Sequence, residues 1–184
     1  MRARTAGAFV LGMACGMALL AALLWHSGTL RVSAAPQVSA ATDDRQHLAM
    51  PIAGIDPATL HDTFDDAREG HKHEALDIRA PRGTPVMAVD EGKVEKLFTS
   101  KPGGLTVYQF DRSGQWCYYY AHLDRYADGL KEGALLHRGD VLGYVGSTGN
   151  ASPEAPHLHF AVNKLAPDKK WWEGTPVDPL PLLR

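Results

Sequence analysis

The chain has little cysteine, no excess of charge of either sign and no internal repeat. Cys15 lies in an apolar N-terminal stretch and Cys117 in the globular part, so a disulfide framework within the domain is excluded. The formal net charge of −2, with histidine neutral, argues against a nucleic-acid partner. The 184 residues leave room for one domain with short appendages. The 18 glycines and 12 prolines, scattered between short apolar runs, favour an all-β domain rich in turns.

One long hydrophobic run is present, near the N-terminus. Residues 5–25 (TAGAFVLGMACGMALLAALLW) are almost continuously apolar, and a membrane-spanning helix needs about 20 such residues. Two arginines precede the run and one follows it closely, which predicts a cytoplasmic N-terminus with the remainder of the chain outside. A signal peptide cleaved near residues 32–34 is the alternative. We favour a single-pass inner-membrane anchor over residues 1–26.

The rest of the chain divides into a tether and a folded domain. Residues 27–47 are rich in alanine, serine and glutamine, which predicts a flexible tether, and the domain is expected over residues 48–184. Asp56 followed by Pro57 is typical of a helix N-cap and first turn, and predicts a short helix to about Phe64. Strands are predicted over residues 84–89, 92–98, 105–110, 115–122, 141–145 and 157–160. Short strands at this spacing favour a sandwich or a barrel.

Four residues form two patterns typical of metal ligands. His73 and Asp77 have the spacing H-x-x-x-D, and His157 and His159 have the spacing H-x-H. On a strand, residues i and i+2 point to the same face, so both imidazoles of H-x-H would emerge together while Leu158 turns into the core. Imidazole and carboxylate are ordinary zinc ligands, and three protein ligands with one open position form the catalytic pattern. Each pattern alone is weak, but together they indicate a zinc hydrolase.

A third motif, Y-x-H-L around His122, completes a resemblance to a known family. The order H-x-x-x-D, Y-x-H-L, H-L-H resembles the LytM/lysostaphin-type zinc metallopeptidases, which cleave peptide bonds of bacterial peptidoglycan. The supporting segments are HEALDI at 73–78, APRGTPV at 80–86, GDVLG at 139–143, GSTGN at 146–150 and PHLHF at 156–160. The resemblance covers about residues 64–160. It implies a small antiparallel β barrel or sandwich of the lysostaphin-like, duplicated-hybrid-motif type, here preceded by the N-terminal transmembrane helix.

The resemblance also implies a role for each motif residue. It makes His73, Asp77 and His159 the ligands of one Zn²⁺ per chain, and His122 and His157 the catalytic pair beside the metal. These two histidines would hydrogen-bond the attacking water or the oxyanion and pass a proton to the leaving amine. Which of them is the base stays open.

The expected function is a membrane-anchored zinc endopeptidase that hydrolyses peptidoglycan stem peptides or crosslinks. Its expected partners are the peptidoglycan substrate and, through the N-terminal helix, the membrane. A non-catalytic activator of a cell-wall amidase is the alternative, although all five motif positions are filled here. A zinc peptidase acting on proteins or on a pentaglycine is a third possibility.

Several neighbouring residues have open roles at this stage. His71 is an alternative ligand, but His73 has the family spacing to Asp77, so an exposed loop position is expected for His71. Glu74 is interpreted as loop surface. Tyr120 and Asp124 flank His122 and are candidates for orienting it, although packing is the commoner role for Tyr120. Trp171 and Trp172 either form an aromatic rim for a glycan or pack against the barrel. The loop at residues 151–155 is longer and richer in proline than is common in the family, which leaves the shape of one cleft wall open.

Overall fold

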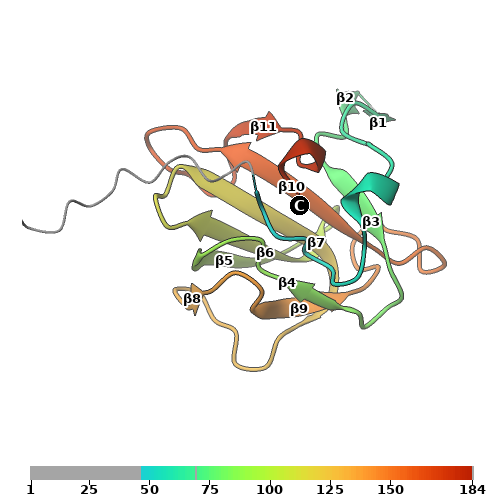
Figure 1. Cartoon of the computed structure of the whole chain (residues 1–184), viewed down its shortest axis with the longest axis horizontal. Coiled ribbons are helices and arrows are strands. Elements are labelled where there is room, and N and C mark those ends of the chain that lie inside the picture. The colour runs from blue at the N-terminus through green and yellow to red at the C-terminus, as the bar shows by residue number, and fades with distance from the viewer. Residues whose placement is uncertain (1–46, 69, 184) are drawn as a thin grey trace, which may run out of the picture. The chain divides into compact units, whose positions relative to one another are not determined.

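The computed structural model describes residues 47–183 apart from residue 69 (Figure 1). The predicted anchor over residues 1–26 and nearly all of the predicted tether lie outside the described residues. Within the described part of the chain, no helix is both long enough and apolar enough to cross a membrane.

The described residues form an almost purely β structure. A two-stranded sheet pairs β1 with β2, and a nine-stranded sheet runs in the order β11-β10-β7-β6-β5-β8, with β3 on β10 and β9 joining β4 to β7. The strands are β1 (Ala67–Arg68), β2 (His71–Lys72), β3 (Leu76–Arg79), β4 (Pro85–Met87), β5 (Gly92–Ser100), β6 (Gly104–Asp111), β7 (Trp116–Tyr126), β8 (Leu135–Leu136), β9 (Val141–Val145), β10 (His157–Lys164) and β11 (Thr175–Val177). All strand pairs are antiparallel, as the family resemblance implies.

Strand β10 carries the H-x-H motif and lies at the centre of the site. It pairs with β7 on one side, and with β3 and β11 on the other (Figure 1). Leu158 and Phe160 are fully buried, whereas His157 and His159 are only partly covered, so the predicted alternation is confirmed. In the register with β3, His159 lies opposite Asp77. Because directly paired residues share a face of the sheet, the pairing brings two distant motifs together.

Strand β7 changes partners midway, at His122. The sequence predicts that the strand ends at His122, but the structure continues it to Tyr126. The register shifts near this point, and His122 has a φ of +59°, in the left-handed region. Residues before the irregularity pair with β10 and residues after it pair with β9. The prediction was wrong because a bulge bends a strand without ending it.

The predicted helix after Asp56 is a single 3₁₀ turn, Pro57–Thr59. The Asp56 side chain caps it by accepting a hydrogen bond from the backbone N–H of Ala58, as predicted. Helix beyond Thr59 was a wrong prediction: Leu60 is extended, and the Asp62 carboxylate accepts from the N–H of Phe64 in a local turn. That competing side-chain bond favours a turn over a continued helix, and the extended segment then carries Thr63 to the site.

One hydrophobic core joins the sheet to both ends of the described chain. Leu76, Ile78, Leu158 and Phe160 pack in it with side chains from the other strands. Leu48 and Leu183 are buried in the same cluster and form a parallel bridge.

Candidate functional site

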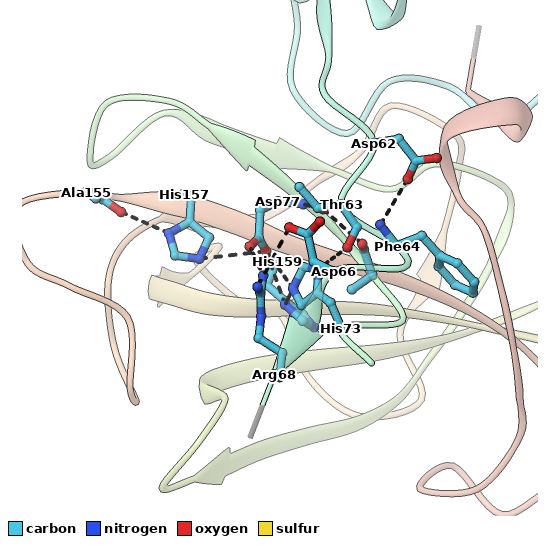
Figure 2. Close-up of polar contacts among 11 residues, drawn as sticks. Asp62, Thr63, Phe64, Asp66, Arg68, His73, Asp77, Ala155, His157 and His159 are labelled. Atoms are coloured by element: carbon cyan, nitrogen blue, oxygen red, sulfur yellow. Dashed lines mark hydrogen bonds and ion pairs between the residues drawn. The ribbon is translucent and has the colours of Figure 1, made fainter. Parts of the chain in front are cut away.

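Three ligand-type atoms from β3, β10 and the loop before β3 meet at one point. His73 Nε2 lies 3.0 Å from His159 Nδ1 and 3.1 Å from Asp77 Oδ1, and His159 Nδ1 lies 3.3 Å from Asp77 Oδ1. Figure 2 shows the three side chains pointing toward one another. Within the described residues, this is the group of histidine, cysteine or acidic side chains that could hold a metal ion.

The triangle has the dimensions of one face of a zinc tetrahedron. Zinc–ligand bonds of 2.0–2.2 Å at tetrahedral angles place ligand atoms roughly 3.3–3.6 Å apart, a few tenths of an ångström more than the observed edges. Asp77 Oδ1 is buried and receives no hydrogen bond from the described residues. A buried, unsatisfied carboxylate oxygen is costly, so a cation at this position would stabilise it. Two imidazoles and one carboxylate are a donor set that zinc favours.

His73 is oriented by a backbone carbonyl that also fixes its tautomer. Its Nδ1 lies 3.0 Å from the carbonyl oxygen of Thr63, which can only accept, so Nδ1 carries the proton and Nε2 presents a lone pair. The Thr63 hydroxyl accepts from the backbone N–H of Asp77 at 3.1 Å and donates to the Ala75 carbonyl. One threonine therefore fixes His73 and the start of β3 together. The His73 side chain is only 6% exposed.

The Asp77 carboxylate is oriented by Arg68. Arg68 Nη2 donates to Oδ2 at 3.4 Å, while Oδ1 faces the two imidazoles (Figure 2). The same guanidinium lies 3.7 Å from Asp66 Oδ2. Arg68 thereby leaves Oδ1 directed at the candidate metal position.

The charge states of Asp77 and His159 suit a cation. Burial alone would raise the pKa of Asp77, but the hydrogen bonds and positive charge that protonated His159 and His73 rings would offer it outweigh burial and hold that pKa below its usual range. Burial lowers the pKa of His159, with Asp77 opposing the shift. At neutral pH the site therefore has an ionised carboxylate and a neutral His159, which are the forms that ligate metals.

His122 and His157 lie beside this triad with their Nε2 atoms available. His157 Nδ1 donates to the carbonyl of Ala155 at 2.9 Å, and His122 Nδ1 donates to the carbonyl of Thr148 at 2.8 Å. Both rings therefore carry the proton on Nδ1 and a lone pair on Nε2. Their centroids are 5.0 Å apart, and that of His122 is 5.6 Å from His159. Burial lowers the pKa of His122 to about 4, so this ring is a neutral proton acceptor at physiological pH.

His122 is held between two loops whose backbones touch. Its N–H donates to the carbonyl of Gly103, and the Thr148 hydroxyl accepts from the N–H of Leu105 at 2.9 Å and donates to the carbonyl of Leu123 at 2.8 Å. A Cβ on Gly104 would lie 2.4 Å from the carbonyl carbon of Thr148. The GSTGN segment singled out in the sequence therefore supplies the close backbone approach that positions His122.

Replacing Thr148 with valine is expected to disturb His122 without removing any ligand. Two hydrogen bonds disappear, which should lower the free energy of unfolding by about 1–3 kcal/mol. Valine keeps the backbone carbonyl that binds His122 Nδ1 but loses the hydroxyl bonds that hold this carbonyl in place. Displacing a group that orients a functional histidine typically costs about 10-fold or more in activity, while the metal content should stay unchanged. Chemical denaturation, metal analysis and turnover test this. Thr175→Val, at an exposed position on β11, is the control. Equal loss of turnover in both variants would contradict a specific role of Thr148 in positioning His122.

All five predicted site residues meet at one hollow of about 570 Å³, which they line together with Arg68, His71, Pro102, Gly103, Tyr119, Ala121, Asn150, Ala151 and Ser152. His71 is exposed on β2 and lies outside the metal-type group. Glu74 is exposed, as expected. Asn150 and the first two residues of the prolyl loop, Ala151 and Ser152, form part of one wall of the hollow.

Orientation of His122 by Asp124 was a wrong prediction. Asp124 accepts from Arg82 at 2.6 Å, and the Tyr120 hydroxyl is buried between Gln109 and the N–H of Val89. The packing role of Tyr120 is thus confirmed. Sequence reasoning missed Thr63 and Thr148 as the orienting residues; the signal for Thr148 was its place between two glycines in GSTGN.

A row of aromatic rings supports His159 from the side of β6 and β7. Tyr119 meets the His159 ring edge-on at 5.8 Å, Tyr108 lies 4.6 Å from Tyr119, and Trp171 lies 4.7 Å from Tyr108. Trp171 is therefore packed onto the sheet, whereas Trp172 is 63% exposed. These contacts restrain the ring orientation of His159.

Comparison with known proteins agrees with this geometry. The model of peptidase family M23 matches residues 71–179, which include all five motif positions. The chain belongs to peptidase family M23. Its relatives in the family include the L-Ala–D-Glu endopeptidase of Bacillus subtilis (strain 168), 33% identical over 74% of this chain and 43% of that protein. They also include lysostaphin of Staphylococcus simulans, 34% identical over 62% of this chain and 22% of that protein.

The solved M23 structures share the fold. The catalytic domain of lysostaphin from Staphylococcus simulans superposes with a TM-score of 0.55 and 29% identity, covering 66% of this chain and 86% of that domain. The predicted lysostaphin-like, antiparallel β architecture is therefore confirmed. The chain spans less than half the length of either curated relative, so their similarity concerns this domain.

Proposed function

We propose that the chain is a zinc-dependent endopeptidase that hydrolyses peptide bonds of peptidoglycan. The observation that carries the proposal is the convergence of His73 Nε2, Asp77 Oδ1 and His159 Nδ1 within 3.3 Å of one another. Two further imidazoles border the same hollow with unprotonated Nε2 atoms. Membership of a peptidase family and the names of the relatives support the reaction and the substrate class.

The three ligand residues and the two neighbouring imidazoles would have separate roles. Bound zinc would supply a Lewis acid for the scissile carbonyl and lower the pKa of a water molecule. His73, Asp77 and His159 would hold the ion. His122 Nε2, neutral because burial lowers its pKa to about 4, can accept the proton of the attacking water and return it to the leaving amine. His157 Nε2 borders the same space, 3.8 Å from Asp77 Oδ1, and its lone pair can accept a hydrogen bond from the attacking water.

The cellular setting is part of the proposal. The apolar run at residues 5–25 and the arginines before it support a single-pass inner-membrane anchor with the peptidase domain in the periplasm. A tether of about twenty residues spans up to roughly 70 Å when extended, which allows the domain to reach peptidoglycan from the membrane.

Digestion of purified peptidoglycan sacculi by the full chain in detergent tests the function. We expect soluble muropeptides whose masses identify a cleaved peptide bond, complete loss of release after a chelator removes zinc, and recovery when zinc is added back. His159→Ala should release nothing. If the wild-type chain with one bound zinc releases no fragments, but a separate amidase releases more in its presence, the chain is an activator and the proposal is wrong.

A further inference from the structure

Arg79 occupies the same face of the sheet as the candidate ligands. It is the last residue of β3 and pairs directly with His157 of β10, just as Asp77 pairs with His159. Side chains at positions i and i+2 of a strand point to one face, and directly opposed residues have Cβ atoms about 4.5–5.5 Å apart. The Arg79 guanidinium therefore extends beside His157, along the direction that leads away from the metal triad.

Arg79 lines a second hollow that continues the first. This hollow has a volume of about 700 Å³ and shares Arg68, Asp77, Ser152 and His157 with the hollow over the triad. Two residues along a strand cover about 7 Å, so Arg79 begins about that far from Asp77. An extended peptide bound over the triad reaches this distance within one or two residues of the bond that is cut.

Within residues 47–183 apart from residue 69, the charge of Arg79 has no acidic partner. Arg68, the other arginine of this hollow, is 3.4 Å from Asp77 and 3.7 Å from Asp66. Among the described residues, no carboxylate lies within ion-pair distance of Arg79, which is exposed. An arginine kept beside a reactive site without an internal partner is suited to an anion on a ligand, since its planar fork of N–H donors matches a carboxylate.

We propose that Arg79 is a specificity-determining residue that binds a free carboxylate of the substrate one or two residues from the scissile bond. The inference rests on the proposed function and narrows its substrate class. A glutamyl residue in a peptide retains one carboxyl group beyond the one in its peptide bond, so a stem peptide containing D-Glu offers such a group. A substrate in which this carboxyl is an amide lacks the charge but has nearly the same shape.

Matched substrates test the inference. Crosslinked stem peptides are prepared with the glutamyl carboxyl either free or as the carboxamide, and kcat/KM is measured for wild type, Arg79→Gln and Arg79→Lys. For the wild type we expect a preference of about 10-fold for the carboxylate, the usual scale of a charge-assisted hydrogen bond. Arg79→Gln should lose this preference through a higher KM with kcat nearly unchanged. Arg79→Lys should retain part of it.

Controls separate this inference from the proposed function. Arg112→Gln removes an exposed arginine that pairs with Glu91 on a different hollow, and should leave the preference intact. Calorimetric binding of the two peptides to His122→Asn chains, with and without Arg79→Gln, gives a readout that needs no turnover. Equal affinities for both peptides, or a preference that survives Arg79→Gln, overturn the inference. Tight, Arg79-dependent carboxylate binding without any cleavage by wild type would instead refute the proposed function alone.

Discussion

Replacing Asp77 with alanine is expected to remove zinc and to abolish hydrolysis. The substitution deletes the carboxylate that completes the triangle with His73 and His159, and two imidazoles alone hold zinc weakly. Turnover should fall by about 10³-fold or more, because the Lewis acid and the activated water are lost together. The fold should persist, since the Asp77 side chain is 25% exposed and its backbone N–H still donates to Thr63.

Metal content by mass spectrometry and melting curves with and without chelator measure this effect. Ligand binding to the native state raises stability, so a chelator should lower the melting temperature of the wild type and leave that of Asp77→Ala unchanged. Asp124→Ala is the matched control, because Asp124 is a partly exposed carboxylate near the site that pairs with Arg82. Full zinc occupancy in Asp77→Ala would show that the ion is held elsewhere.

Replacing His122 with asparagine is expected to separate metal binding from catalysis. The hydrogen bond from His122 Nδ1 to the Thr148 carbonyl leaves a lone pair on Nε2, which faces the hollow. His122 is not one of the three residues that could hold the metal. Loss of a general base typically costs about 10²–10⁴-fold in rate, whereas zinc content should stay at one per chain. Asparagine is preferred to alanine because the backbone φ of +59° is better tolerated by asparagine.

The His122→Asn experiment needs parallel zinc and rate measurements on one preparation. His137→Asn is the control: His137 has a side chain 80% exposed and pairs with Asp140 away from the site, so both quantities should match wild type. If His122→Asn loses zinc as well as activity, His122 ligates the metal and the division of roles proposed above fails.

The spacing of the motifs predicts the parts of the site that lie on one strand. H-x-H places His157 and His159 on one face because a strand alternates its side chains, and the structure has this alternation, with Leu158 fully buried between them. The meeting of that strand with Asp77 depends on the β3–β10 register. Register is set by long-range pairing, which spacing alone does not fix; here only the family resemblance linked the two motifs.

The residues that orient the site are hard to identify from sequence patterns. Thr63 and Thr148 bind the rings of His73 and His122 through backbone carbonyls, which every residue carries. Only the glycines on either side of Thr148 in GSTGN mark one of the two in the sequence. The prediction of a helix to Phe64 was wrong because a local turn at Asp62 and a contact with the distant His73 determine the path of that segment. The bulge at His122 likewise depends on loops that are far apart along the chain.

Locating the bound metal ion tests most directly the claim that His73, Asp77 and His159 hold it. A crystal of the zinc-loaded chain, with diffraction recorded on both sides of the zinc absorption edge, would locate the ion. We expect one strong anomalous peak about 2.0–2.2 Å from His73 Nε2, Asp77 Oδ1 and His159 Nδ1, with His122 and His157 nearby but not bound to it. A peak ligated by His71, His122 or His157 in place of any of these three atoms, or no peak between them, would contradict it.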